Sequence, residues 1–139
     1  MKKLTCLTLP LLVLTGCKAN NQIEESHNYH EVKDDLIPWS DIFDIDSNDY
    51  LLYFYSERCG HCSEIKNNVI SYYEHTDKEM YFVCTDIDAV FGPKIDLTDI
   101  DNIEDFYIFG TPFLTRIYNF KVKEYYAGSN SILEYLRKN

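Results

Sequence analysis

The chain has 139 residues, of which 45% are hydrophobic and 26% are charged. These values are typical of one globular domain and exclude a disordered or low-complexity chain. With 13 Lys and Arg against 23 Asp and Glu, the formal net charge is −10. Because phosphate binding needs clustered positive charge, we expect no nucleic-acid partner. Five cysteines are too few for a disulfide-stapled scaffold, so their positions matter more than their number.

The N-terminus has the features of a secretory signal. Lys2 and Lys3 precede a mostly apolar run over residues 4–14, which is too short to cross a membrane. The run ends in Leu-Thr-Gly-Cys17, which resembles a bacterial lipobox, a signal in which the cysteine receives a diacylglycerol and becomes the new N-terminus. We therefore predict a lipoprotein signal peptide over residues 1–16 and a lipid on Cys17. The alternatives are an ordinary signal peptide and an apolar N-terminal helix that stays attached.

The segment after this signal is polar. We interpret residues 17–35 as the lipidated cysteine and a linker, with a short edge strand near His30–Val32, and residues 36–139 as the folded domain. Cleavage after residue 16 removes two lysines and no acid, so the mature net charge is about −12. Since an anionic membrane surface repels an acidic domain, the lipid would act as a tether. This predicts a location on the outer face of the bacterial cytoplasmic membrane.

The first half of the domain is predicted to form a strand, a helix and a second strand. Leu51–Tyr55 is a continuous apolar run, typical of a strand buried on both faces. A helix is expected over about 59–75, because apolar residues recur there with helical spacing at Cys62, Ile65, Val69 and Tyr73. Met80–Cys84 reads as the second buried strand. Such a unit implies parallel strands and a right-handed crossover.

The second half is predicted to contain a helix, a hairpin and a final helix. Thr98 could cap a helix that extends to Phe109 and stops at Gly110-Thr111-Pro112. Two strands over 113–118 and 123–126 would pair as a hairpin, and a short helix would end the chain. A further helix is expected over Pro38–Ile45. Together these elements predict an α/β domain with a central mixed sheet flanked by helices.

The chemistry is concentrated in Cys59-Gly60-His61-Cys62, between the first strand and the first helix. A helix N-terminus offers unpaired N–H groups and partial positive charge, which favour a thiolate. The two-residue spacer places both sulfurs on one turn, close enough for a disulfide. We expect Cys59 to be exposed and reactive and Cys62 to be shielded. His61 and Arg58 would add positive charge beside the Cys59 thiolate.

These residues resemble the thioredoxin superfamily. The segment Phe54–Cys62 resembles its active-site strand and helix, and Gly110–Leu114 resembles its cis-proline loop; the resemblance covers roughly residues 36–138. It implies that Cys59 is the attacking nucleophile and Cys62 the resolving cysteine. It also implies that Pro112 is a cis-proline beside the disulfide and that Thr111 offers its backbone to an extended substrate. No organic cofactor or metal is required for that chemistry.

Some positions depart from the pattern: Arg58 replaces the usual Trp before the first cysteine, and Asn67 replaces the proline that kinks the helix. Thioredoxin has a buried carboxylate six residues before its first cysteine, and Tyr53 stands there in this chain. The acid that would take the proton from Cys62 is therefore missing or comes from elsewhere. The Gly60-His61 spacer resembles that of protein disulfide isomerases, and a threonine before the cis-proline also occurs in bacterial disulfide isomerases. Both features point to a less reducing pair than that of thioredoxin.

The sequence thus predicts a membrane-tethered, extracytoplasmic thiol–disulfide oxidoreductase. Its expected partners are thiols and disulfides of exported proteins and a redox protein of the membrane, and we expect a monomer. A zinc site would need two more ligands, for which only Cys84, His75 and His61 are available. Copper delivery is another alternative, since two thiolates and a histidine suit Cu(I). The remaining alternative is a binding or accessory module, for example in peptide export, with little redox turnover.

Overall fold

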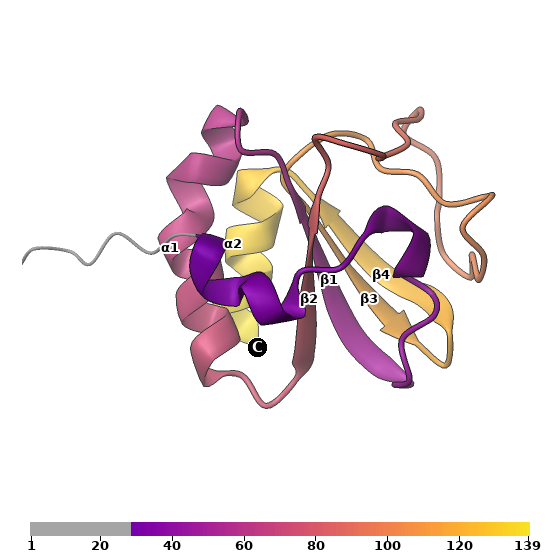
Figure 1. Ribbon diagram of the computed structural model, residues 1–139, viewed down its shortest axis with the longest axis horizontal. Helices are drawn as coiled ribbons and strands as arrows, with labels where there is room; N and C mark the ends of the chain where they lie inside the picture. Colours follow the sequence, from indigo (N-terminus) through magenta and orange to yellow (C-terminus); the bar gives the residue numbers. More distant parts are fainter. Residues whose placement is uncertain (1–28) are drawn as a thin grey trace, which may run out of the picture.

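The computed structural model describes residues 29–139 (Figure 1). The predicted signal peptide and Cys17 lie outside the described residues. The elements in chain order are the 3-10 helices η1 (Tyr29–Asp35) and η2 (Trp39–Asp41), then β1 (Asp49–Tyr55), α1 (Gly60–His75), β2 (Glu79–Cys84), β3 (Phe113–Tyr118), β4 (Lys121–Ala127) and α2 (Ser129–Lys138). No helix among these elements is both long and apolar enough to cross a membrane.

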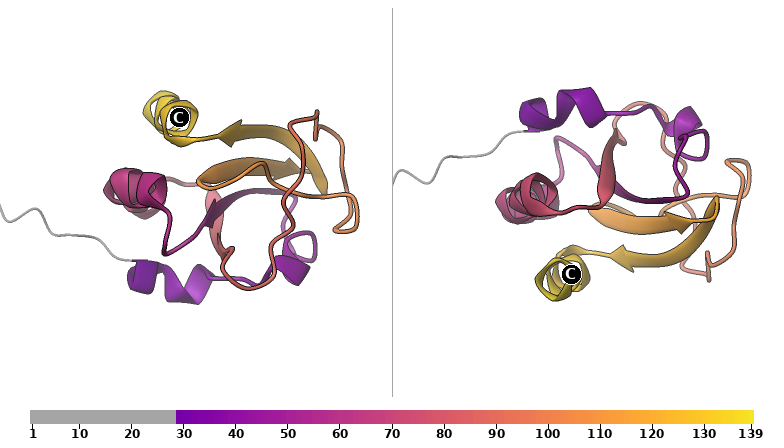
Figure 2. Two further views of the ribbon diagram at one scale, coloured as in Figure 1. Left: turned by 90° about the horizontal axis from the view of Figure 1, so that it is seen from above. Right: turned by 90° about the horizontal axis from the view of Figure 1, so that it is seen from below.

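The four strands form one mixed sheet in the order β2-β1-β3-β4. β1 and β2 are parallel and are joined through α1, which confirms the predicted strand–helix–strand unit. β3 runs antiparallel to both β1 and β4, and the β3–β4 hairpin was also predicted. Seen from above and below, α1, α2 and η1 cover one face of the sheet, while η2 and the long β2–β3 connection cover the other (Figure 2).

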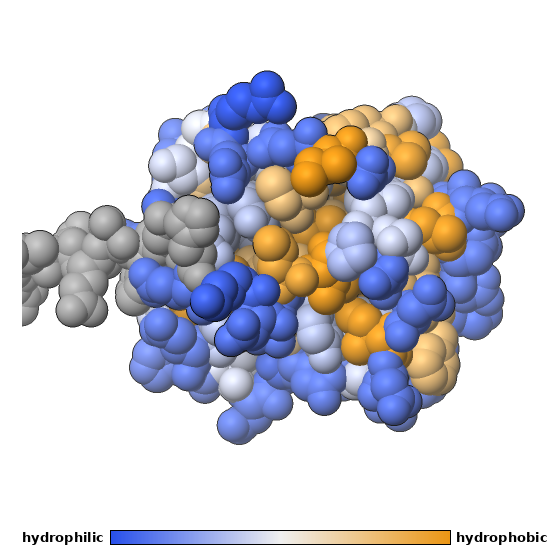
Figure 3. Space-filling model, in the orientation of Figure 1, coloured by the Kyte–Doolittle hydropathy of each residue, from blue (hydrophilic) through white to orange (hydrophobic). Residues whose placement is uncertain are grey.

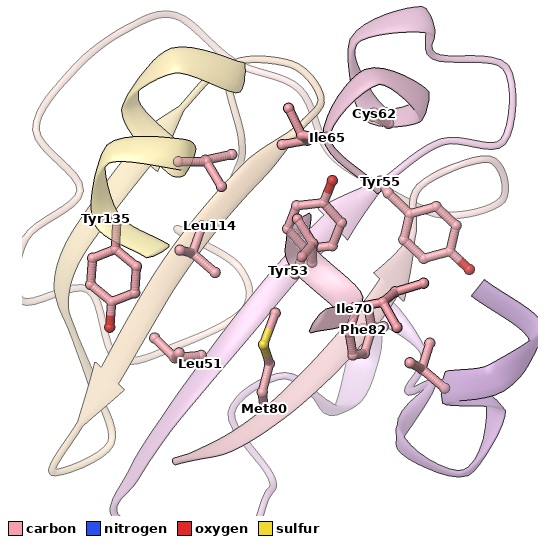
Figure 4. Packing of buried hydrophobic residues seen from close by; sticks show 13 residues of the cluster. Leu51, Tyr53, Tyr55, Cys62, Ile65, Ile70, Met80, Phe82, Leu114 and Tyr135 are labelled. Atoms are coloured by element: carbon pink, nitrogen blue, oxygen red, sulfur yellow. The ribbon is translucent and has the colours of Figure 1, made fainter. Parts of the chain in front are cut away.

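Two apolar cores lie on opposite faces of β1. Leu51, Tyr53 and Tyr55 lie on the face that α1, α2 and η1 cover, and Tyr55 points towards η1 (Figure 4). The intervening Tyr50, Leu52 and Phe54 point towards η2 and the β2–β3 connection. Every side chain from residue 50 to residue 55 is buried, because successive residues of a strand face opposite sides and both sides are covered here.

The helix predicted over Thr98–Phe109 is wrong, since the chain is irregular there. Asp99 has a left-handed backbone, with φ at 69°, which a helix cannot include. The amide of Asp99 instead donates to the carbonyl of Val122, and the amide of Val122 donates to the carbonyl of Ile100, both at 2.8 Å. The segment therefore satisfies its backbone groups on the edge of β4 instead of in a helical turn.

The N-terminal part of the described chain also differs from the prediction. The edge strand expected near His30–Val32 is wrong, because these residues belong to η1. Val32 is buried, and the Leu36 backbone forms a parallel bridge with Phe82 of β2. The helix expected over Pro38–Ile45 is reduced to the single turn of η2. The segment is polar overall, so its composition does not indicate that a few of its residues pack against the fold.

Candidate active site

Cys59 occupies the N-cap position of α1. Its sulfur accepts a hydrogen bond from the backbone N–H of Cys62 at 3.2 Å, a contact that stabilises negative charge on the sulfur. The same sulfur lies 3.3 Å from the carbonyl oxygen of Thr111, to which the thiol donates. Cys59 is partly exposed, so a dissolved or bound disulfide can reach it.

Cys62 lies one turn further along α1 and is buried, with 1% of its surface exposed. Burial raises the pKa of its thiol, and the hydrogen bond with Cys59 raises it further. The two sulfurs are free thiols in the structure. The pair is therefore asymmetric: an accessible sulfur at the helix N-terminus and a shielded thiol behind it.

The loop before β3 brings Thr111 and Pro112 to the cysteines. The Thr111–Pro112 peptide bond is cis, as the resemblance implied. Pro112 is buried, and its carbonyl accepts from the amide of Gly128, which leads into α2. Residues about 50 positions apart in the chain are thus held on one surface by the pairing of β1 with β3.

His61 and Arg58, which were predicted to add positive charge beside Cys59, each contact an acidic side chain. The His61 side chain is 74% exposed, and its Nδ1 lies 3.0 Å from a carboxylate oxygen of Glu64. Arg58 is 83% exposed and pairs with Asp86 at 3.5 Å. Both residues lie near Cys59 in the sequence, and each side chain contacts a carboxylate.

Asp86 fixes the loop that leads into Cys59. Its carboxylate accepts hydrogen bonds from the Ser56 hydroxyl at 2.7 Å and from the Glu57 amide at 3.0 Å. These bonds lower the pKa of Asp86 below the ordinary value, so it stays ionised. The sequence analysis missed this residue. The available signal was topological, because Asp86 and Ser56 follow two parallel neighbouring strands whose ends meet at the same edge of the sheet.

A pair of tyrosines lies behind Cys62. Tyr53 is fully buried, and its hydroxyl lies 3.1 Å from that of Tyr29. The Tyr29 hydroxyl also donates to the backbone carbonyl of Cys62 at 3.4 Å, and its ring stacks on Tyr55. Burial raises the pKa of both hydroxyls, so the pair is neutral. Tyr53 was expected at this place, whereas Tyr29 was assigned to the linker and missed.

Two hollows lie beside the cis-proline loop. One, of about 210 Å³, is lined by Lys94, residues 109–112, Ala127 and Gly128. The other, of about 460 Å³, is lined by His61, Glu64 and residues 127–131. They share Ala127 and Gly128, so the two hollows adjoin. Within residues 29–139, no three His, Cys, Asp or Glu side chains are grouped closely enough to hold a metal ion.

Neither a protein-family model nor a curated protein sequence matches the chain. Several solved structures are similar to it. Thioredoxin f2 of Chlamydomonas reinhardtii is 12% identical with a TM-score of 0.47, covering 74% of this chain and 93% of its own. A mutant thioredoxin from Halobacterium salinarum NRC-1 is 17% identical with a TM-score of 0.48, and the match covers 76% of this chain and 90% of that thioredoxin. The reduced Schistosoma mansoni thioredoxin pre-protein is 15% identical with a TM-score of 0.46, and the match covers 75% of this chain and 97% of that protein.

The architecture of the chain is thioredoxin-like. It combines a mixed four-stranded sheet and flanking helices with a cysteine pair at the start of α1 and a cis-proline directly before β3. The cysteine pair Cys59 and Cys62 is the candidate chemical centre of this arrangement, because within residues 29–139 it alone joins an accessible sulfur to a second sulfur one turn away.

Proposed function

We propose that the protein is a thiol–disulfide oxidoreductase in which Cys59 is the nucleophile and Cys62 the resolving cysteine. The observation that carries this proposal is the position of the Cys59 sulfur. It is partly exposed at the N-cap of α1, 3.3 Å from the Thr111 carbonyl beside the cis-proline, with Cys62 buried behind it. That placement combines stabilisation of a thiolate with access for an extended substrate.

The reaction transfers two electrons in two exchanges. The Cys59 thiolate attacks one sulfur of a substrate disulfide, forming a mixed disulfide and releasing the other substrate sulfur as a thiolate, which takes a proton. Cys62 then loses its proton and attacks the Cys59 sulfur. The internal disulfide forms, and the second substrate thiol leaves. The substrate is reduced and the protein is oxidised; the same steps run in reverse when the pair starts as a disulfide.

Trapping the intermediate tests this assignment. We expect reduced Cys62→Ser protein, mixed with a peptide disulfide, to keep a mixed disulfide on Cys59 that mass spectrometry can locate. Cys84→Ser is the matched control, since Cys84 is a third, partly exposed thiol outside the pair, and it should turn over without accumulating the adduct. An adduct on Cys84, or none on Cys59, would contradict the proposal.

The reduction potential of the Cys59–Cys62 pair decides the direction of electron flow. A value near about −270 mV in thiol buffers would indicate a reductant of the thioredoxin kind. A value of about −120 to −180 mV would indicate an oxidase or isomerase, which the Gly60-His61 spacer and Thr111 favour.

We place this activity outside the cytoplasm, on the outer face of the bacterial membrane, with a lipid on Cys17 as the anchor. The support is the order of charges, apolar run, small residues and cysteine in residues 1–17. The partners would then be thiols and disulfides of exported proteins and a membrane redox protein. We expect Cys17→Ser to move the protein from the detergent-soluble membrane fraction to the soluble fraction, and an unchanged distribution would contradict the anchor.

A second candidate function is a binding or accessory module with little redox turnover. The observation that favours it is the neutral Tyr53 where a base could otherwise serve Cys62. A Cys59→Ser/Cys62→Ser double variant separates the two functions. Biological activity that survives the double change would support the binding module, whereas its loss would support the oxidoreductase.

A further inference from the structure

Apolar side chains are concentrated on the surface of one loop. Of seven large hydrophobic residues that are exposed within residues 29–139, four lie between positions 87 and 95. Their exposed fractions are 82% for Ile87, 51% for Val90, 56% for Phe91 and 54% for Ile95. Single exposed apolar residues are ordinary, but four within nine positions are a concentration of the kind found at binding surfaces. We call residues 87–95 the apolar loop.

The backbone of this loop is fixed by hydrogen bonds although its side chains face outwards. The Gly92 amide donates to the Ile108 carbonyl, and the Ile108 amide donates to the Val90 carbonyl, each at 3.0 Å. Gly92 also packs tightly against the ring of Tyr107, where an added Cβ would lie 2.3 Å from a ring carbon. The apolar side chains are therefore presented by an ordered backbone, which lowers the entropy cost of binding.

The apolar loop begins beside the segment that leads into Cys59 and ends at the hollow that contains Thr111. At its start, Asp86 is hydrogen-bonded to the loop that leads into Cys59. Near its start, Ile87 borders an apolar hollow of about 200 Å³ formed with Leu36 and Trp39. Near its end, Lys94 lines the hollow that contains Thr111 and the cis-proline. Figure 3 shows apolar side chains gathered over β2 and over the chain that follows η1.

Lys94 adds a charge preference to this surface. It is exposed and has no ion pair within the described residues, although the chain as a whole is strongly acidic. Arg58 and Lys121, by comparison, pair with Asp86 and Asp101. Charges further away than about 8 Å are screened at physiological salt, and Lys94 is the one charged residue among those that line the hollow, so a group bound there responds mainly to Lys94. The group that complements Lys94 is a carboxylate.

We propose that the apolar loop and Lys94 select protein partners in which the reacting cysteine is accompanied by apolar side chains and a carboxylate. This inference rests on the proposed function, because it names the substrate class of the Cys59 site. The apolar side chains of the partner would cover Ile87 and Phe91, and its carboxylate would pair with Lys94 in the hollow beside Thr111.

Short cysteine peptides carried as mixed disulfides with thionitrobenzoate test this inference. The Cys59 thiolate attacks the peptide sulfur, the S–S bond breaks, and coloured thionitrobenzoate leaves with the electron pair, so no other oxidant or reductant is needed. One peptide carries leucines and an aspartate near its cysteine. A second replaces the aspartate with lysine, and a third replaces the leucines with serine. The readout is the rate with each peptide divided by the rate with a small disulfide that has no side chains.

The wild-type protein should react about three- to tenfold faster with the aspartate peptide than with the lysine peptide, since a surface ion pair is modest and the swap replaces attraction by repulsion. Lys94→Glu should invert that preference. In the Ile87→Ser/Phe91→Ser variant, the ratio of the rate with the leucine peptide to the rate with the serine peptide should fall about tenfold. The reason is that two apolar side chains are no longer partly buried against the peptide.

The matched controls lie at the far end of the sheet. Phe120 is 51% exposed in the β3–β4 turn, and Lys123 is an exposed lysine of β4. Phe120→Ser and Lys123→Glu should leave every ratio unchanged. Unchanged ratios in the Lys94 and Ile87/Phe91 variants, or equal changes in the controls, would overturn the inference. Failure of every probe, including the small disulfide, to react at Cys59 would overturn the proposed function instead.

Discussion

At the scale of single residues, Tyr53 and Tyr29 determine the environment of Cys62. Two neutral hydroxyls stand where a carboxylate would supply a base, and burial keeps both protonated. Neither tyrosine is therefore ionised, and neither can accept the proton that Cys62 loses. The simplest acceptors during resolution are solvent and the departing substrate thiolate.

This arrangement predicts a strong pH dependence of the resolving step. Because burial raises the pKa of Cys62, its thiolate fraction rises about tenfold for each pH unit below that pKa. The release of a small thiol from a Cys59 mixed disulfide should therefore accelerate about tenfold per unit between pH 6 and pH 9. Stopped-flow measurements would detect this slope. A plateau below pH 8 would show that a local base takes the proton.

The Tyr29 hydroxyl also contributes to stability. Tyr29→Phe keeps the ring that stacks on Tyr55 but leaves the buried Tyr53 hydroxyl without its partner. We expect a loss of about 1–3 kcal/mol in the free energy of unfolding, measured with urea. Tyr73→Phe is the control, because its partner Asp35 is only partly buried and can turn to water. Equal losses in the two variants would contradict this role for Tyr29.

At the scale of elements, the β2–β3 connection has no helix or strand and is held by backbone hydrogen bonds within itself and to Val122 of β4. Gly92 is its tightest point, since a Cβ there would lie 2.3 Å from the Tyr107 ring. Gly92→Ala should lower the free energy of unfolding by about 1–3 kcal/mol through overpacking. Gly60→Ala should not, because nothing lies within 4 Å of its added Cβ.

A double-mutant cycle separates overpacking from other effects of this change. In a Tyr107→Ala background the ring is gone, so Gly92→Ala should have almost no additional effect on unfolding. A loss of the same size in both backgrounds would show that the glycine matters for its backbone freedom and not for the close approach of the ring.

The elements that could be predicted from the sequence are those with a local pattern. Residues 51–55 form a strand because the apolar run is continuous, and α1 follows the apolar spacing of Ile65 and Val69. The segment after Thr98 has helical spacing as well, but its backbone pairs with the edge of β4 at Val122, a contact remote in sequence. Local patterns do not reveal such a partner, and tertiary contacts override them.

The candidate site divides in the same way. The cysteine pair and the Thr111–Pro112 loop could be predicted because short motifs mark them. Tyr29 could not, because it is an isolated aromatic residue in a polar segment and only the fold brings it to Cys62. Its spacing of three from the buried Val32 was the one available indication of an apolar face.

At the scale of the whole molecule, one arginine joins three strands across the sheet. Arg116 of β3 makes two hydrogen bonds of 2.7 Å to Asp49, the first residue of β1, and lies 3.6 Å from a carboxylate oxygen of Glu124 in β4. The bonds from Arg116 lower the pKa of Asp49. A two-bond arginine–carboxylate pair is stronger than most surface pairs, although both side chains remain partly exposed.

The sign of the pH dependence follows from the lowered pKa of Asp49. The stabilisation is present above the ordinary pKa near 4 and is lost as the pH falls through the lower value of the folded state. Asp49→Asn should therefore destabilise the protein by about 1 kcal/mol at pH 7 and by almost nothing at pH 2. Urea unfolding of both proteins at each pH measures this difference.

The difference between the two proteins is the informative quantity, because the net charge of −10 has its own effect. Partial protonation of the many carboxylates below pH 7 relieves repulsion in both proteins alike. Glu134→Gln is the matched control, since its lysine pair is a single exposed contact within α2, and its effect should be smaller at pH 7. If Asp49→Asn and Glu134→Gln are equivalent at pH 7, the three strands are joined by apolar packing and backbone hydrogen bonds alone.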